Sequence, residues 1–186
     1  KELVKSWRIK QYQGALVGGV SHAAYLHRLG FRGPVARGYD VVDNDYFREE
    51  SERWRAKDQT SGLTINPYFL ASNRFVERKN LIRLVQVFAA AVRKPSVGRR
   101  GSTDLCLLGD GPEGNILRST CAELDLPVIE AAPWEVKRSV SSASSGPRVF
   151  LPGFRQIEEL PRFYAHACCF VHPAISEPWG LVINEA

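Results

Sequence analysis

Residues 68–112, YFLASNRFVERKNLIRLVQVFAAAVRKPSVGRRGSTDLCLLGDGP, determine the fold class of this chain. They open with an apolar run at 68–71, continue with apolar residues at helical spacing between Leu81 and Val92, and return to an apolar run at 105–108. Short apolar runs bounded by Gly and Pro are typical of buried strands, and the spacing between them predicts an amphipathic helix. The stretch therefore predicts one strand-helix-strand unit.

The same alternation continues toward the end of the chain. Strand-like runs recur at 149–151 (VFL) and 169–171 (CFV), and two further segments show helical spacing. One face of the first segment carries Ile116, Thr120 and Leu124, and the second segment carries Leu160, Phe163 and Ala167. Strands that alternate with helices form parallel sheets covered on both faces. The predicted fold class is α/β, with a doubly wound parallel sheet.

The remaining segments break this rhythm. Residues 15–17 (ALV) and 41–42 (VV) predict short strands, whereas 43–66 is charged and suits an exposed helix or a linker. We therefore expect 1–66 to be the end of one domain with its linker, and 67–186 to be a second domain that is cut off at its C-terminus. The Pro- and Ser-rich stretch 127–147 is expected to be a mobile surface insertion with a short helix near Trp134.

The composition indicates a globular protein rather than a disordered or membrane-spanning one. Hydrophobic residues make up 44% and charged residues 24% of the 186 residues. The net charge of +5 is scattered, with one basic cluster at Arg93, Lys94, Arg99 and Arg100, so nucleic-acid binding is not expected. Four cysteines without metal-type spacing favour a reduced, cytoplasmic setting. A location at the inner face of a membrane is compatible with this setting. The chain lacks Met and is expected to be a fragment of a longer polypeptide.

Basic residues follow the first predicted strand of the 68–112 unit. Arg74 and Lys79 lie five positions apart between a strand end and a helix start. Ligands of parallel sheets collect at the carboxyl ends of the strands, where these two cations could flank one diphosphate. An ordinary solvated basic loop explains the same residues.

Two further loops follow predicted strands. The loop at 109–112 (GDGP) is too short for a dinucleotide fingerprint and is expected to be structural. In the last loop Glu177 precedes Gly180, and Glu185 lies eight positions beyond Glu177. Carboxylates there could accept hydrogen bonds from sugar hydroxyls, although an acidic first helical turn has the same pattern. His172 is expected to make a local hydrogen bond rather than to act as a base.

The three loops occur together and in order, as FLASNRFVERKNLIRLVQVFA, LCLLGDGPEG and VFLPGFRQIEELPRFYAHACCFVHPAISEPWGLVINEA. This set resembles the C-terminal domain of glycosyltransferase family 4, whose members have the GT-B fold of two Rossmann-like domains. Upstream, YLHRLG and GYDVVDNDYF resemble the end of the N-terminal, acceptor-side domain and the crossover. The resemblance implies a nucleotide-sugar-dependent transferase that retains anomeric configuration and needs no metal or other cofactor.

The resemblance also implies roles for particular residues. Arg74 and Lys79 would hold the donor diphosphate, and Glu177 would face the transferred sugar. Glu185 would bind the ribose. Gly180 and Leu181 would donate their backbone amides to the donor, and Phe154 would lie near the base. Asn73 stands where the family commonly has Gly, and Ala174 stands where it often has Ser.

Other functions are compatible with these residues. A catalytically silent protein that binds nucleotide-sugars, or an epimerase of the GT-B type, would share much of the pattern. UDP-, GDP- and ADP-sugars all fit as donors, and the acceptor is unknown. Peripheral association with a membrane is compatible with the charge. By itself the fragment is expected to be inactive.

Overall fold

The computed structural model describes residues 2–38, 41–93, 103–136, 146–177 and 179–186. The chain divides into two compact units, Lys1–Asp43 and Asn44–Ala186. Most of the basic cluster (94, 99 and 100) and serines 139–145 lie outside the described residues.

The first unit is a small α/β arrangement. Its elements are α1 (Glu2–Ile9), β1 (Ala15–Val17), α2 (Val20–Arg28) and β2 (Val35–Arg37). The two strands are parallel, with Ala15 opposite Val35, and the buried side chains are Val17, Ala23, Leu29 and Phe31. Residues 15–17 are a strand as predicted. Residues 41–42 are not a strand, and Val41 is exposed. β2 ends at Arg37, and the next residue, Gly38, has a φ of +114°, which strand residues do not adopt.

The second unit contains the parallel sheet predicted from the sequence. Its strands are β3 (Tyr68–Ser72), β4 (Asp104–Leu108), β5 (Val128–Ile129), β6 (Val149–Gly153) and β7 (Ala167–Phe170). Its helices are α3 (Asn44–Thr60), the short 3₁₀ helix η1 (Glu77–Lys79), α4 (Leu81–Val92), α5 (Gly114–Glu123), α6 (Leu160–His166) and α7 (Val182–Glu185). The strand order is β5-β6-β4-β3-β7, and all neighbouring strands are parallel.

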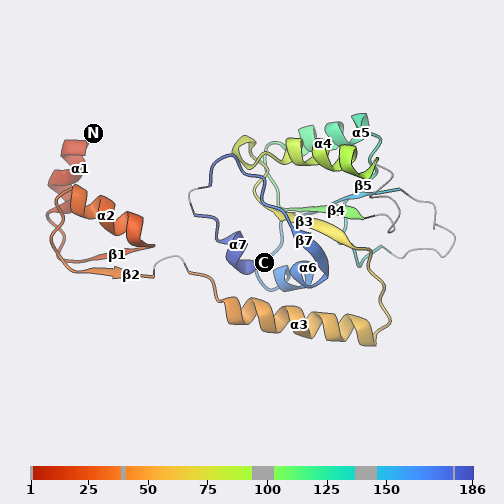
Figure 1. Cartoon of the computed structure of the whole chain (residues 1–186), viewed down its shortest axis with the longest axis horizontal. Helices are drawn as coiled ribbons and strands as arrows, with labels where there is room; N and C mark the ends of the chain where they lie inside the picture. The colour runs from red at the N-terminus through yellow and green to blue at the C-terminus, as the bar shows by residue number, and fades with distance from the viewer. Residues whose placement is uncertain (1, 39–40, 94–102, 137–145, 178) are drawn as a thin grey trace. The chain divides into compact units, whose positions relative to one another are not determined.

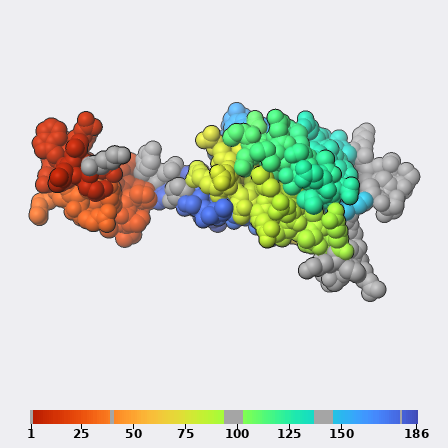
Figure 2. All heavy atoms as spheres, turned by 90° about the horizontal axis from the view of Figure 1, so that it is seen from above, coloured from red at the N-terminus to blue at the C-terminus, as the bar shows by residue number. Residues whose placement is uncertain are grey.

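Helices cover both faces of this sheet. Figure 1 shows α4 and α5 on one face, and α6 with α3 on the other. Figure 2 looks onto the first of these faces, where α4 and α5 lie side by side. The predicted α/β class, with a doubly wound parallel sheet, is therefore confirmed.

The centre of the sheet explains why its strands are continuously apolar. All five residues of β4 are buried, and the side chains of Leu105, Leu107 and Leu108 are almost completely shielded from solvent. Burial of one such side chain contributes about 1.5–3 kcal/mol. The main core lies between the sheet and α4 with α5, where Val85, Leu117 and others pack against Leu105 and Leu107.

The polar helix α3 belongs to the second unit. Ser51 Oγ donates to Pro161 O at 3.0 Å, and Arg55 Nε donates to Ala165 O at 2.7 Å. Both acceptors are carbonyl groups of α6. The chain therefore divides at residues 43–44, whereas the sequence pattern placed the boundary near 66–67. The pattern missed this packing because α3 has few apolar residues, although Phe47 is buried and its ring centroid lies 5.9 Å from that of Tyr164 in α6.

The stretch 127–147 is only in part a surface insertion. Its beginning forms β5, which pairs with β6, and Ala132 is fully buried. The ring of Trp134 packs on Phe163 with a centroid distance of 4.5 Å. Residues 134–136 form a turn and a bend rather than the expected helix. The described part of this stretch is thus anchored to the sheet and to α6.

Candidate functional site

The loops after β3 and β4 are hydrogen-bonded to each other and to the last residues of β4 and β6 at one edge of the sheet. The amide of Asn73 donates to Leu108 O at 2.9 Å, and that of Phe75 donates to Asp110 O at 2.8 Å. The amide of Gly109 donates to Gly153 O at 3.0 Å. Because the strands are parallel, their carboxyl ends meet at this edge, where α/β sheets bind ligands.

The glycines of the β4 loop are required by close backbone contacts. At Gly109, where φ is +130°, a Cβ atom would lie 1.9 Å from the carbonyl oxygen of Asn73. At Gly111, where φ is +155°, it would lie 2.5 Å from Phe75 O. This geometry supports the structural role that the sequence suggested for residues 109–112. Asn73, which stands where the resembled family commonly has Gly, is not among the residues with positive φ.

A cavity of about 520 Å³ opens at this edge. Three of the residues predicted from the sequence line it, namely Arg74, Phe154 and Glu185. Its other lining residues are Ser72, Asn73, Leu108, Gly109, Asp110, Arg155, Leu160 and Val182. Its size is within the range of small-molecule sites, which is about 300–1,000 Å³.

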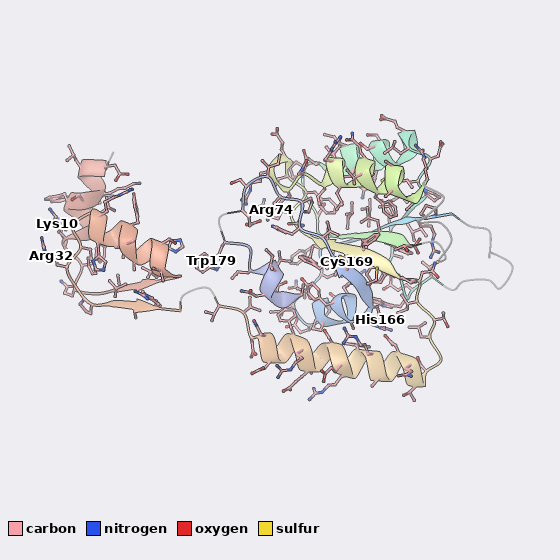
Figure 3. The ribbon with its side chains drawn as sticks, in the orientation of Figure 1. Lys10, Arg32, Arg74, His166, Cys169 and Trp179 are labelled. Carbon is pink, nitrogen blue, oxygen red and sulfur yellow. The ribbon has the colours of Figure 1, made fainter. Side chains whose placement is uncertain are left out.

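Arg74 is the exposed cation of this cavity. Within the described part of the chain, its guanidinium makes no hydrogen bond or ion pair. Figure 3 shows Arg74 at the end of the sheet, on the side of the unit where α7 lies. The side chain is therefore available to an anionic ligand.

Glu185 is held by a buried phenol. Tyr164 Oη donates to Glu185 Oε2 at 2.9 Å. Burial raises the pKa of Tyr164 well above its ordinary value, and the nearby charge of Glu185 raises it further. The phenol therefore stays protonated and acts as a donor, which orients the carboxylate at the wall of the cavity.

Lys79 and Glu177 form an ion pair, and His172 joins it. Lys79 Nζ contacts Oε2 of Glu177, and His172 Nε2 lies 3.0 Å from the same oxygen. The hydrogen bond from Lys79 is the largest cause that lowers the pKa of Glu177, ahead of the Lys79 charge and the His172 hydrogen bond. Partial burial of the carboxylate opposes this shift. Glu177 is thus held in its charged form.

Gly180 and Leu181 lie just before α7. Gly180 has a φ of +70°, and a Cβ there would lie 3.2 Å from Cγ of Glu177, so the glycine makes room for the Glu177 side chain. Among the described residues, the amides of Gly180 and Leu181 donate to no other group. Neither residue lines the large cavity.

Five of the predicted site residues therefore fall into two groups at one edge of one unit. Arg74, Phe154 and Glu185 share the cavity, whereas Lys79 and Glu177 pair with each other and are not among its lining residues. Sequence reasoning missed Tyr164, although it lies four positions after Leu160 of the cavity wall and so shares its helix face.

Two other findings concern the part of the chain that the structure describes. No three His, Cys, Asp or Glu side chains are grouped there so that they could bind a metal ion. No helix in these ranges is long and apolar enough to span a membrane.

The chain belongs to the family described as glycosyl transferases group 1, whose model matches residues 52–186. Its fold is similar to that of Anabaena Alr3699/HepE solved with UDP and glucose, with a TM-score of 0.57 and 17% identity over 100% of this chain. The complex of the same protein with UDP-glucose gives a TM-score of 0.52 and 18% identity over 91% of this chain. The chain spans 45% and 41% of these two structures, respectively. No curated protein sequence matches it.

Proposed function

We propose that this chain forms the nucleotide-sugar-binding part of a retaining glycosyltransferase of family 4. The observation that carries the proposal is the cavity of about 520 Å³ at the carboxyl ends of β3, β4 and β6. Its wall contains Arg74, which makes no ion pair with the described residues, and Glu185, which Tyr164 orients. A guanidinium fork suits a diphosphate, and a carboxylate suits the paired hydroxyls of a ribose. The diphosphate and the ribose of a nucleoside diphosphate thus each have a partner.

The remaining residues complete the donor site. Phe154, which is 69% exposed at the cavity, would contact the base. Lys79, whose ammonium group has three donors, would turn toward the diphosphate when the donor binds. Glu177 would face the transferred sugar, and the amides of Gly180 and Leu181 would donate to the donor. In this reaction the protein positions the donor and neutralises charge on the leaving diphosphate, so no metal is required.

UDP is the first nucleotide to test, because HepE, which shares the fold, was solved with UDP and with UDP-glucose. Calorimetry of the folded chain with UDP, GDP and ADP would measure binding and rank the bases. We expect at least one of the three to bind. Absence of binding for all three in a folded sample would overturn the proposed site.

An arginine comparison tests the location of the diphosphate. Arg74→Ala should weaken nucleotide binding about 10- to 150-fold, because a hydrogen bond to a charged group contributes about 1.5–3 kcal/mol. Arg78→Ala is the matched control, since Arg78 is exposed in the same loop and does not line the cavity. It should change the Kd by no more than about twofold. Equal losses in the two variants would show general charge attraction instead of a site.

The roles of the two acids are separable by kinetics in a full-length enzyme that contains this chain. Glu177→Ala should reduce kcat on the order of 100-fold or more, because a group aimed at the reacting sugar acts in the transition state. Glu185→Ala should mainly raise the KM for the donor. The stereochemistry of the product, read by proton NMR of its anomeric centre, tests retention. Unaltered kinetics in both variants would contradict these roles.

A further inference from the structure

The described residues hold Glu177 through one of its two carboxylate oxygens. Lys79 and His172 both contact Oε2, and no hydrogen bond to Oε1 is formed within the described part of the chain. The Glu177 side chain keeps 21% of its surface exposed. One oxygen is thus fixed by the protein, and the other is left for a ligand.

His172 is itself held in place. Its ring stacks on Phe170, with a centroid distance of 6.4 Å and an interplanar angle of 16°. Its Nδ1 atom is buried and has no hydrogen-bond partner among the described residues. A proton on Nδ1 would be a buried donor without an acceptor, which is costly. The proton of a neutral ring therefore belongs on Nε2, from which it is donated to Glu177.

The two donors to Glu177 are not equivalent. Lys79 carries a mobile point charge on a long stem, and it is also the expected partner of the donor diphosphate. A diphosphate that attracts Lys79 would weaken its contact with the carboxylate. The imidazole of His172, stacked on Phe170 at the end of β7, has no such competing partner in the proposed site.

We propose that His172 is the positioning residue of Glu177, holding Oε2 so that Oε1 faces the transferred sugar when the diphosphate engages Lys79. The inference rests on the proposed function of Glu177 and adds a residue that the family resemblance did not assign. His172 acts through Glu177 and does not itself touch the donor.

The first test does not depend on transferase activity. The pKa of the Glu177 carboxyl is measured in the full chain by carbon-13 NMR for the wild type, His172→Phe and His172→Gln. Lys79 from η1 and His172 from the loop after β7 are the titratable groups that face this carboxyl in the described residues. Phe keeps the stacked ring but cannot donate, whereas the Gln amide can donate from nearly the position of Nε2.

In this titration His172→Phe should raise the pKa of Glu177, and His172→Gln should restore it toward the wild-type value. A pKa that is the same in the wild type and in folded His172→Phe would overturn the proposal. Equal shifts in the Phe and Gln variants would also overturn it, because a purely structural effect of losing the imidazole predicts that result.

The second test measures transfer in the full-length enzyme. His172→Phe should lower kcat on the order of tenfold, with a donor KM within about twofold of wild type, and should move the acidic limb of the pH profile upward. An unchanged kcat in an active enzyme would refute the role of His172. Absence of activity in the wild type would instead refute the proposed function, and the NMR titration would still decide whether His172 positions Glu177.

Discussion

Removal of the buried carboxylate of Asp58 should be among the most damaging substitutions in the second unit. Asp58 lies on α3 and is 3% exposed. Arg162 of α6 donates to both of its oxygens, at 3.0 and 2.7 Å, and His166 Nε2 lies 2.8 Å from Oδ2. Figure 3 shows His166 on the side of α6 that faces α3. Asp58→Ala would leave both partners without their acceptor.

The magnitude follows from this geometry. Removing one partner of a buried ion pair costs about 3–5 kcal/mol. The guanidinium of Arg162 would remain between the rings of Trp54 and Trp134, each 4.4 Å from it, and its side chain is 20% exposed. These contacts favour the lower limit, so we expect a loss of about 3 kcal/mol in the free energy of unfolding. That loss corresponds to a decrease in Tm of about 6–12 °C for a chain of this size.

Urea denaturation followed by tryptophan fluorescence would measure the loss. Asp45→Ala is the matched control on the same helix, because Asp45 pairs with Arg48 at 2.8 Å while 75% of its side chain is exposed. It should cost at most about 1 kcal/mol, the upper range of a surface pair near a helix N-terminus. Equal losses in the two variants would refute the reasoning.

The same carboxylate gives a dependence on pH. Burial raises the pKa of Asp58, but the hydrogen bonds and charges of Arg162 and His166 outweigh burial, so the pKa lies below its ordinary value of 3.8. A group whose pKa is lower in the folded state than in the unfolded state stabilises the folded state when the pH is above its unfolded-state pKa. This stabilisation is lost as the pH falls through the folded-state pKa. The stability difference between the wild type and Asp58→Ala should therefore shrink below about pH 4. A difference that stays constant to lower pH would contradict the assignment.

Two further substitutions test the edge of the sheet. Gly109→Ala should lower stability by about 3 kcal/mol or more, because its Cβ would lie 1.9 Å from Asn73 O. Gly153→Ala should cost only about 1–2 kcal/mol, because φ there is +80° but no atom lies within 4 Å of the added Cβ. Thermal melts would compare them, and equal Tm values would count against the close contact. Tyr164→Phe should raise the Kd for UDP about 2- to 10-fold, because Glu185 loses its orienting donor. Calorimetry would measure this, and an unchanged Kd would exclude an orienting role.

The sequence by itself determined the central strands of the sheet. The runs at 68–71, 105–108 and 149–151 predicted β3, β4 and β6, because a parallel strand covered by helices on both faces must be apolar at nearly every position. The helical spacing from Leu81 to Val92 likewise predicted α4. In a parallel sheet the loops at the carboxyl ends of the strands share one edge, which is why the sequence pattern places Arg74 and Glu185 there.

Only the tertiary structure decided which polar groups meet. Asp58 contacts a residue 104 positions away, and Lys79 contacts one 98 positions away. Local spacing reports the burial of apolar side chains, but a charged residue in a polar helix gives the same pattern whether it faces solvent or an ion-pair partner. For that reason the sequence did not reveal that α3 packs on α6, that Tyr164 orients Glu185, or that His172 and Lys79 share one oxygen of Glu177.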